Sequence, residues 1–293
     1  MLKTDTYLEK SFELWPGLLR FAATGEAAYA ALEAGLDAAR EVAATLMADA
    51  ELIANAQFDG GAFDLLPRGH AGRLAADAMR AMTQAVPASR LSDLPPPLVA
   101  LPGAVCDVVM EEMRNAGACD TVVVSLGDAL AFHVVGGATM PADIVLPPVT
   151  AEFLRMLGDG QSGGVALFGA SAHFPSAGIT DRGALHAKCA ALASLSAAYV
   201  VDGMSTLGMP CRTERIADPL VARAVEGRAL AGRVGLLAPE TIWDVLSGGM
   251  KRAAQLREKR LLRAVALALK GRGRTLGPVD GNRLVRFGVS EWR

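Results

Sequence analysis

Aromatic residues make up 5% of this 293-residue sequence, and cysteine occurs four times. Proteins that bind single-stranded nucleic acid stack its bases on exposed rings, so the scarcity of rings argues against that class. The cysteines Cys106, Cys119, Cys189 and Cys211 show no C-x-x-C spacing. We therefore expect reduced thiols, mostly buried, rather than a disulfide framework.

Long apolar runs and targeting signals are also lacking. The most apolar stretch is residues 189–201, which is too short for a membrane span of about 20 residues. The N-terminus has no basic segment followed by an apolar block, so we expect no signal peptide and a cytoplasmic protein. Arginine outnumbers lysine 23 to 6, which together with the abundant alanine indicates a GC-rich bacterial genome.

The familiar catalytic motifs are missing. Gly-Lys-Ser/Thr, the end of a nucleotide-binding P-loop, does not occur. Residues 160–164 spell G-x-S-x-G, but a nucleophile elbow needs a strand before the serine and a helix after it. Here a predicted helix precedes it and a predicted strand, 165–168, follows. The sequence thus leaves open whether the protein is an enzyme, and it indicates no cofactor.

Charge is what the sequence does have, and it is unevenly divided. Residues 251–293 carry twelve Lys or Arg against three acids, a net +9, in a chain whose total is −2. The first 250 residues must therefore carry −11. An acidic body with a basic end indicates an anionic partner or a contact steered by charge.

Three segments follow from the pattern of residues: a helical N-terminal region (1–90), an α/β core domain (98–238) and a basic C-terminal helix and tail (239–293). The first is rich in Ala, Leu, Glu and Arg, and we interpret 6–90 as helical. The prolines between 87 and 102 predict a linker. The fold class is α/β or α+β, and no internal repeat is visible.

The middle segment predicts a small mixed sheet with a β-hairpin. Runs 121–126 and 129–135 favour strands, and Gly127-Asp128 between them suits a two-residue turn that needs φ > 0 at the glycine. Helices are expected at 104–116 and 150–157 and from 180 or 181 to 195, followed by a buried strand at 197–201 and a helix at 216–232.

The C-terminal segment predicts one long amphipathic helix, 239–270, broken near Gly248-Gly249. On a helix of 3.6 residues per turn, Arg252, Lys259, Arg263 and Lys270 fall on one side and apolar residues on the other. The pattern equally suits a solvated face that keeps a small apolar stripe soluble.

Our first functional hypothesis is a non-catalytic binding or assembly protein whose basic helix contacts an acidic protein or nucleic acid. Lipid is a less suitable partner, because the apolar face is mostly alanine. The sequence leaves the oligomeric state open, including a homo-oligomer. The residues expected to contact the anionic partner are Arg252, Lys259, Arg260, Arg263, Lys270, Arg272 and Arg274.

The alternative is an enzyme or small-molecule-binding protein. Loops 169–176 and 202–212 flank predicted strands, and such rims of α/β sheets often hold ligands. Their polar residues favour a phosphate- or anion-containing ligand and form the predicted ligand site: Ser171, His173, Ser176, Asp202, Ser205, Thr206 and Arg212.

A metal site is a further alternative in the same place. If 180–195 is helical, His186 and Cys189 lie on one face, and His173 and Cys211 lie in the loops nearby. Two histidines and two cysteines suit tetrahedral zinc, although the spacing matches no standard finger. We therefore predict no metal site.

Overall fold

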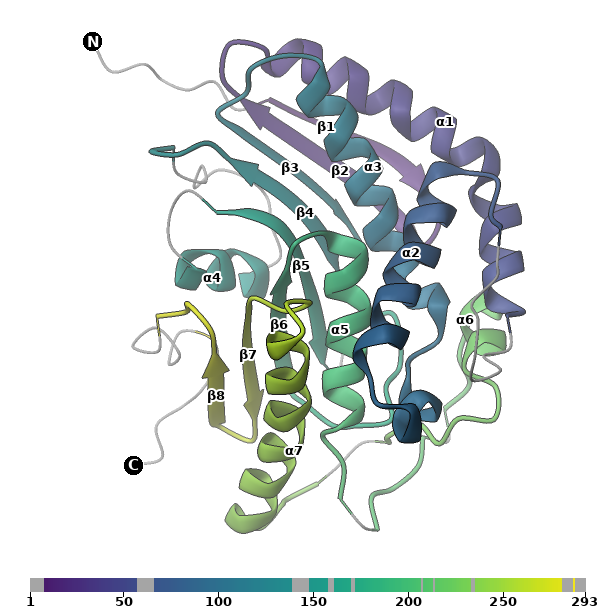
Figure 1. Cartoon of the computed structure of the whole chain (residues 1–293), viewed down its shortest axis with the longest axis vertical. Helices are drawn as coiled ribbons and strands as arrows, with labels where there is room; N and C mark the ends of the chain where they lie inside the picture. The colour runs from purple at the N-terminus through teal and green to yellow at the C-terminus, as the bar shows by residue number, and fades with distance from the viewer. Residues whose placement is uncertain are drawn as a thin grey trace.

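The computed structural model describes residues 8–56, 66–138, 148–157, 161–169, 172–206, 208–212, 214–232, 235–280 and 287. Its centre is one antiparallel sheet of eight strands that lie side by side in chain order (Figure 1). The strands are β1 (Leu8–Leu14), β2 (Gly17–Thr24), β3 (Thr121–Leu126), β4 (Ala129–Val134), β5 (Ser162–Gly169), β6 (Arg182–Ala187), β7 (Ala264–Leu269) and β8 (Arg272–Leu276).

Helices cover one face of this sheet in a matching order (Figure 1). Helix α1 packs on β1 and β2, α3 on β3 and β4, α5 on β5 and β6, and α7 on β7 and β8, while α2 lies against α3 and α5. The bounds are α1 (Ala28–Ala54), α2 (His70–Ala85), α3 (Leu101–Asn115), α5 (Ala190–Asp202), α6 (Pro219–Ala224) and α7 (Pro239–Glu258), with 3-10 turns η1 (Ala88–Asp93) and η2 (Pro97–Ala100).

The opposite face of the sheet has a second, smaller core. Helix α4 (Pro148–Leu157) packs there, and its Phe153 is buried in one apolar cluster with Val165 and Ala184 of the sheet. Because both faces of the central strands are covered, β3, β4, β6 and β7 consist of nearly continuous buried residues rather than alternating ones.

The order of elements occurs twice. The first series consists of two strands and a helix (β1, β2, α1), followed by a helix and two strands (α3, β3, β4). The second series has the same order, with β5, β6 and α5 followed by α7, β7 and β8. No sequence repeat accompanies it. In a sheet with this order, the turns inside β1–β2, β3–β4, β5–β6 and β7–β8 all lie at one end. We call this the hairpin end.

Several predictions made from the sequence about the fold are confirmed. The structure mixes helices and strands, helices α1 and α2 follow from residue 28 on, and α3 and α4 lie where expected. The hairpin of β3 and β4 is also confirmed, with φ of +58° at Gly127. The small mixed sheet is wrong, because the sheet is large and wholly antiparallel.

Residues 8–24 were expected to be helical and instead form β1 and β2. In β1, partly buried residues alternate with exposed ones, which is the period of a strand with one covered face. The interpretation of 180–201 is reversed: β6 occupies the expected helix and α5 the expected strand. Helix α5 is buried on nearly every side, and such a segment lacks the periodicity that separates a helix from a strand. Of the helix expected at 216–232, α6 alone is formed.

The C-terminal helix is confirmed for 239–258 and wrong beyond. Gly248 and Gly249 do not break α7; a Cβ on Gly248 would lie 2.3 Å from the Gly203 carbonyl oxygen, so the glycine permits close packing on the end of α5. Residues 264–276 then form a hairpin. Its turn, Lys270-Gly271, has φ of +48° and +72°, as a two-residue type I′ turn requires. In the described part of the chain, no helix is long and apolar enough to cross a membrane.

Candidate ligand pocket

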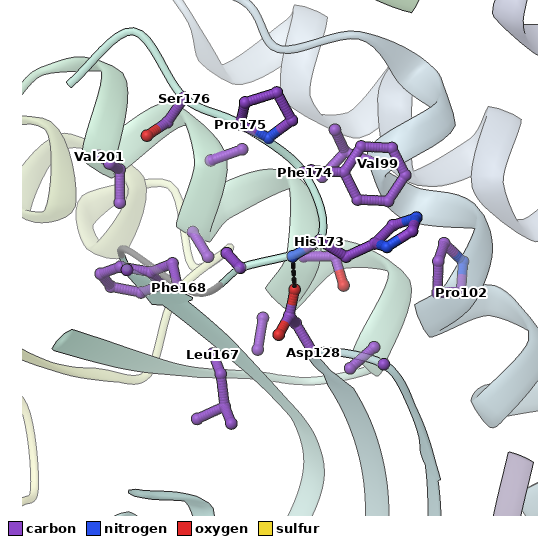
Figure 2. Close-up of a pocket in the computed structure, with 18 of the residues that line it drawn as sticks. Val99, Pro102, Asp128, Leu167, Phe168, His173, Phe174, Pro175, Ser176 and Val201 are labelled. Carbon is purple, nitrogen blue, oxygen red and sulfur yellow. Dashed lines mark hydrogen bonds between the residues drawn. The ribbon is translucent and has the colours of Figure 1, made fainter. Parts of the chain in front are cut away.

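A pocket lies at the hairpin end, between the sheet and helix α5 (Figure 2). Its space, including the part that opens to solvent, is about 580 Å³. The turn of β3 and β4 and the end of β5 form one wall, α5 with η2 and α3 another, and residues 172–176 pass over it as a roof.

Most of this lining is apolar. Figure 2 shows Phe168 and Val201 on one side and Phe174 with Val99 on the other. Helix α5 contributes Ala197 and Ala198, whose small side chains leave the space empty. Such walls can enclose the apolar body of a ligand, while the few polar groups fix its orientation.

Asp128 is the acidic residue among the described residues that line the pocket. Its Oδ2 accepts a hydrogen bond of 2.6 Å from the His173 backbone N–H, and its carbonyl accepts one of 2.8 Å from Leu167 N–H. Oδ1 has no hydrogen-bond partner among the described residues and is not sealed in the interior. Burial raises the pKa of Asp128, although the His173 amide and imidazole oppose the rise.

His173 is held from the side away from Asp128. Its ring meets Trp15 and Phe174 edge to face, with centroids 6.3 and 5.2 Å away. Nε2 is buried without a hydrogen bond, 3.6 Å from Oδ2 of Asp218. That distance is too long for a hydrogen bond, so the pair attracts when the imidazole is protonated. Asp218 is fixed in turn by Trp15 Nε1 and by the first amides of α6.

Two hydroxyl groups belong to the described residues that line the pocket, and both donate their protons away from it. Ser176 Oγ donates to the Gly178 carbonyl at 2.9 Å, and Ser194 Oγ donates to the Ala190 carbonyl at 3.0 Å. Each oxygen therefore has only lone pairs left for a ligand.

The family comparison covers this region. A model of the family described as AbpE bacteria matches residues 21–275, from β2 to β8. The chain belongs to the AbpE bacteria family. This agrees with the bacterial origin that the composition indicated, and the description of the AbpE bacteria family names no activity. No curated protein matches the chain.

In this member of the AbpE bacteria family, two predicted ligand-site residues, His173 and Ser176, line the pocket. Ser171 lies outside the described residues. Asp202 does not line the pocket: it is buried, pairs with Arg228 at 2.7 Å and accepts the Ala177 amide at 2.7 Å. Burial raises its pKa, against the nearby arginines. It supports the roof rather than a ligand.

The remaining predicted residues, Ser205, Thr206 and Arg212, also lie outside the lining of this pocket. Ser205 and Arg212 are exposed, and Arg212 is 3.8 Å from Glu214. Strand β6 occupies much of the helix that was expected to bring loops 169–176 and 202–212 together. The chain just after the first loop nevertheless meets the start of the second, because the Ala177 amide donates to Asp202 and the Ile179 amide donates to the Met204 carbonyl.

The residues of the metal alternative do not share a helix face. His186 lies in β6, where Nε2 is 3.2 Å from the Ser162 carbonyl and burial lowers the pKa to about 4. Cys189 caps α5, and Cys211 is exposed opposite Ala231. Within the described ranges, no three His, Cys, Asp or Glu side chains gather as a metal site would require.

The basic residues expected on one helix lie on several elements. Arg252 of α7 turns inward, 2.9 Å from Asp93 and 4.5 Å from the centroid of the Tyr199 ring. Arg263 donates to the Ser162 carbonyl, and Lys270 is 3.9 Å from Asp181. Lys259 and Arg260 are exposed at the end of α7, while Arg272 and Arg274 lie on β8. The single helical stripe is therefore wrong.

The sequence did not identify Asp128, Trp15 or Asp218 as residues at or beside the pocket. Asp128 had been placed in the correct turn, but nothing local distinguishes a turn aspartate from a ligand-facing one. Its role becomes visible once the eight strands are in chain order, because that order brings the β3–β4 turn beside the β5–β6 loop.

Proposed function

We propose that this protein binds a small molecule with a largely apolar body in the pocket at its hairpin end. The observation that carries the proposal is Oδ1 of Asp128, which accepts no hydrogen bond from the described residues and belongs to a side chain that lines a largely apolar pocket. A charged oxygen in such surroundings is costly unless a ligand satisfies it. The proposal corresponds to the small-molecule alternative that the sequence predicted at loop 169–176, but the chemical class of the ligand is different.

The ligand differs from the anion first expected. No lysine or arginine is found among the described residues that line the pocket, and Asp128 would repel a phosphate or carboxylate. A hydrogen-bond donor on the ligand fits better.

Cyclohexylmethanol, a neutral probe with one ring and one donor, tests the proposal by calorimetric titration. We expect binding, and loss of at least tenfold in affinity in Ala198→Phe, which fills the pocket from α5. Ala44→Phe, on the exposed side of α1, is the matched control. The proposal fails if neither this probe nor its amine analogue cyclohexylmethylamine binds at about 10 mM, or if Ala198→Phe binds the probe as well as the wild type does.

A second candidate function uses the basic C-terminal part. Arg272 and Arg274 place their guanidinium groups 5.8 and 5.3 Å from the ring centroid of Trp243, which is 37% exposed. This surface supports contact with an anionic partner, an acidic protein or nucleic acid.

Titration of polyglutamate and duplex DNA at about 10 mM ionic strength, where screening is weak, tests this contact. Binding should weaken steeply with salt and in Arg272→Gln/Arg274→Gln. The exposed pair Lys251→Gln/Arg257→Gln on α7 removes the same charge elsewhere. Undetectable binding to both polyanions would rule the contact out.

A further inference from the structure

We propose that the polar head of the pocket's ligand is a protonated primary amine, seated on the carboxylate of Asp128. This inference rests on the proposed function and names the ligand class. Three features of the described residues carry it: the donor and acceptor pattern of the lining, its charge, and the fixed position of the Asp128 carboxylate.

The first feature is the direction of the hydrogen bonds. The protons of Ser176 and Ser194 are engaged by backbone carbonyls, and the His173 amide is engaged by Asp128. What these side chains still offer is oxygen lone pairs: Oδ1 of Asp128 and the two hydroxyl oxygens. An ammonium group has three donors and no acceptor, so it complements such a lining.

The second feature is charge. His173 is the described lining residue that can become cationic, and the buried Nε2 of its ring faces Asp218 instead of Asp128. The described lining places no lysine or arginine beside the Asp128 carboxylate, and the His173 imidazole, whose charge lowers the pKa of Asp128, forms no hydrogen bond with it. A hydrogen bond between ionised partners is about twice as strong as a neutral one, which favours an ammonium over a hydroxyl.

The third feature is preorganisation. The backbone of Asp128 is tied to Leu167, and Oδ2 is tied to the roof, so Oδ1 keeps one position without ordering at binding. A receptor group already fixed in place loses little entropy when a ligand arrives.

Three probes that share one ring test the inference: cyclohexylmethylamine, which is cationic at neutral pH, cyclohexylmethanol and cyclohexanecarboxylate. We expect the amine to bind the wild type about tenfold or more tightly than the alcohol, and the carboxylate to be weakest. Equal binding of amine and alcohol would overturn the amine inference and leave the proposed function standing. Binding of none of the three would overturn both.

The Asp128→Asn variant tests whether the Asp128 carboxylate causes the preference for the amine. Its side-chain oxygen still accepts the His173 amide, so the roof keeps its anchor while the charge is removed. The preference for amine over alcohol should fall to about twofold or less. Asp37→Asn removes the same charge from a side chain 72% exposed on α1 and should keep the full preference. A full preference in Asp128→Asn would overturn the assignment.

Discussion

Trp15 and Asp218, 203 positions apart in the chain, are joined by a hydrogen bond of 2.7 Å from Nε1 to Oδ2. The same Oδ2 lies 3.6 Å from Nε2 of His173, while Oδ1 caps helix α6. Through one carboxylate, the first hairpin, the start of α6 and the roof of the pocket are therefore held together.

Trp15→Phe removes the indole donor and keeps an aromatic ring beside His173. We expect the free energy of unfolding to fall by about 1 kcal/mol, the usual net value of such a hydrogen bond. Denaturant titration measures it. Trp243→Phe is the control, because no hydrogen bond is found for its indole among the described residues, and it should cost less than half as much. Equal losses would show that the Asp218 contact contributes nothing.

Arg228→Met should be far more damaging. It leaves the buried Asp202 carboxylate without its 2.7 Å partner. Because the Arg228 side chain is 25% exposed, we expect a loss at the lower end of the roughly 3 to 5 kcal/mol that breaking a fully buried ion pair costs. In Arg228→Met/Asp202→Asn no charge is left stranded, so the double variant should be more stable than Arg228→Met alone. Urea midpoints with equal slopes give the comparison; a less stable double variant would contradict this account.

His186 should make the protein sensitive to acid. Its folded-state pKa of about 4 lies below the ordinary 6.5, so between these values the unfolded chain binds a proton that the folded chain does not. Its contribution is complete above about pH 6.5 and is lost as the pH falls toward 4. From about pH 7 to pH 5 the loss is about 2 kcal/mol. In His186→Gln that part of the pH dependence should vanish. An unchanged difference in unfolding free energy between the two pH values would contradict the buried neutral state.

Asp107 should act in the opposite sense. Burial raises its folded-state pKa to about 6, although both oxygens accept amides at the start of α5, Ala190 and Ala191. The folded chain thus holds a proton between about pH 4 and 6 that the unfolded chain has lost. Stability from this residue is present below that window and is lost as the pH rises through 6. Relative to the wild type, Asp107→Asn should lose about 1 kcal/mol more on going from about pH 7 to pH 5. A parallel pH curve would show that Asp107 is ionised throughout.

Local signals explain what could be predicted of the fold. The strands β3 and β4 follow from β-branched runs around Gly127-Asp128, and α3 and α4 follow from helical composition between turns. The signals fail where burial is complete. Ala-Val-Ala-Leu-Ala-Leu in β7 is buried at every position, as is nearly all of α5, and an apolar run with no polar face suits either structure.

The pocket was predictable only in part. His173 and Ser176 were found because they lie in one polar loop, whereas Asp128, Pro16 and Val99 reach the pocket from distant segments. The uneven charge distribution led to the wrong prediction of a single basic helix for a related reason. Counting charges does not show that Arg252 turns inward to Asp93, or that a hairpin follows at residues 264–276.

A crystal structure of the protein with cyclohexylmethylamine tests the central claim most directly. We predict that the ring lies between Phe168 and Phe174 and that the nitrogen is about 3 Å from Oδ1 of Asp128. Clear density for the amine elsewhere, with the pocket at Asp128 empty at saturating ligand, would contradict the account.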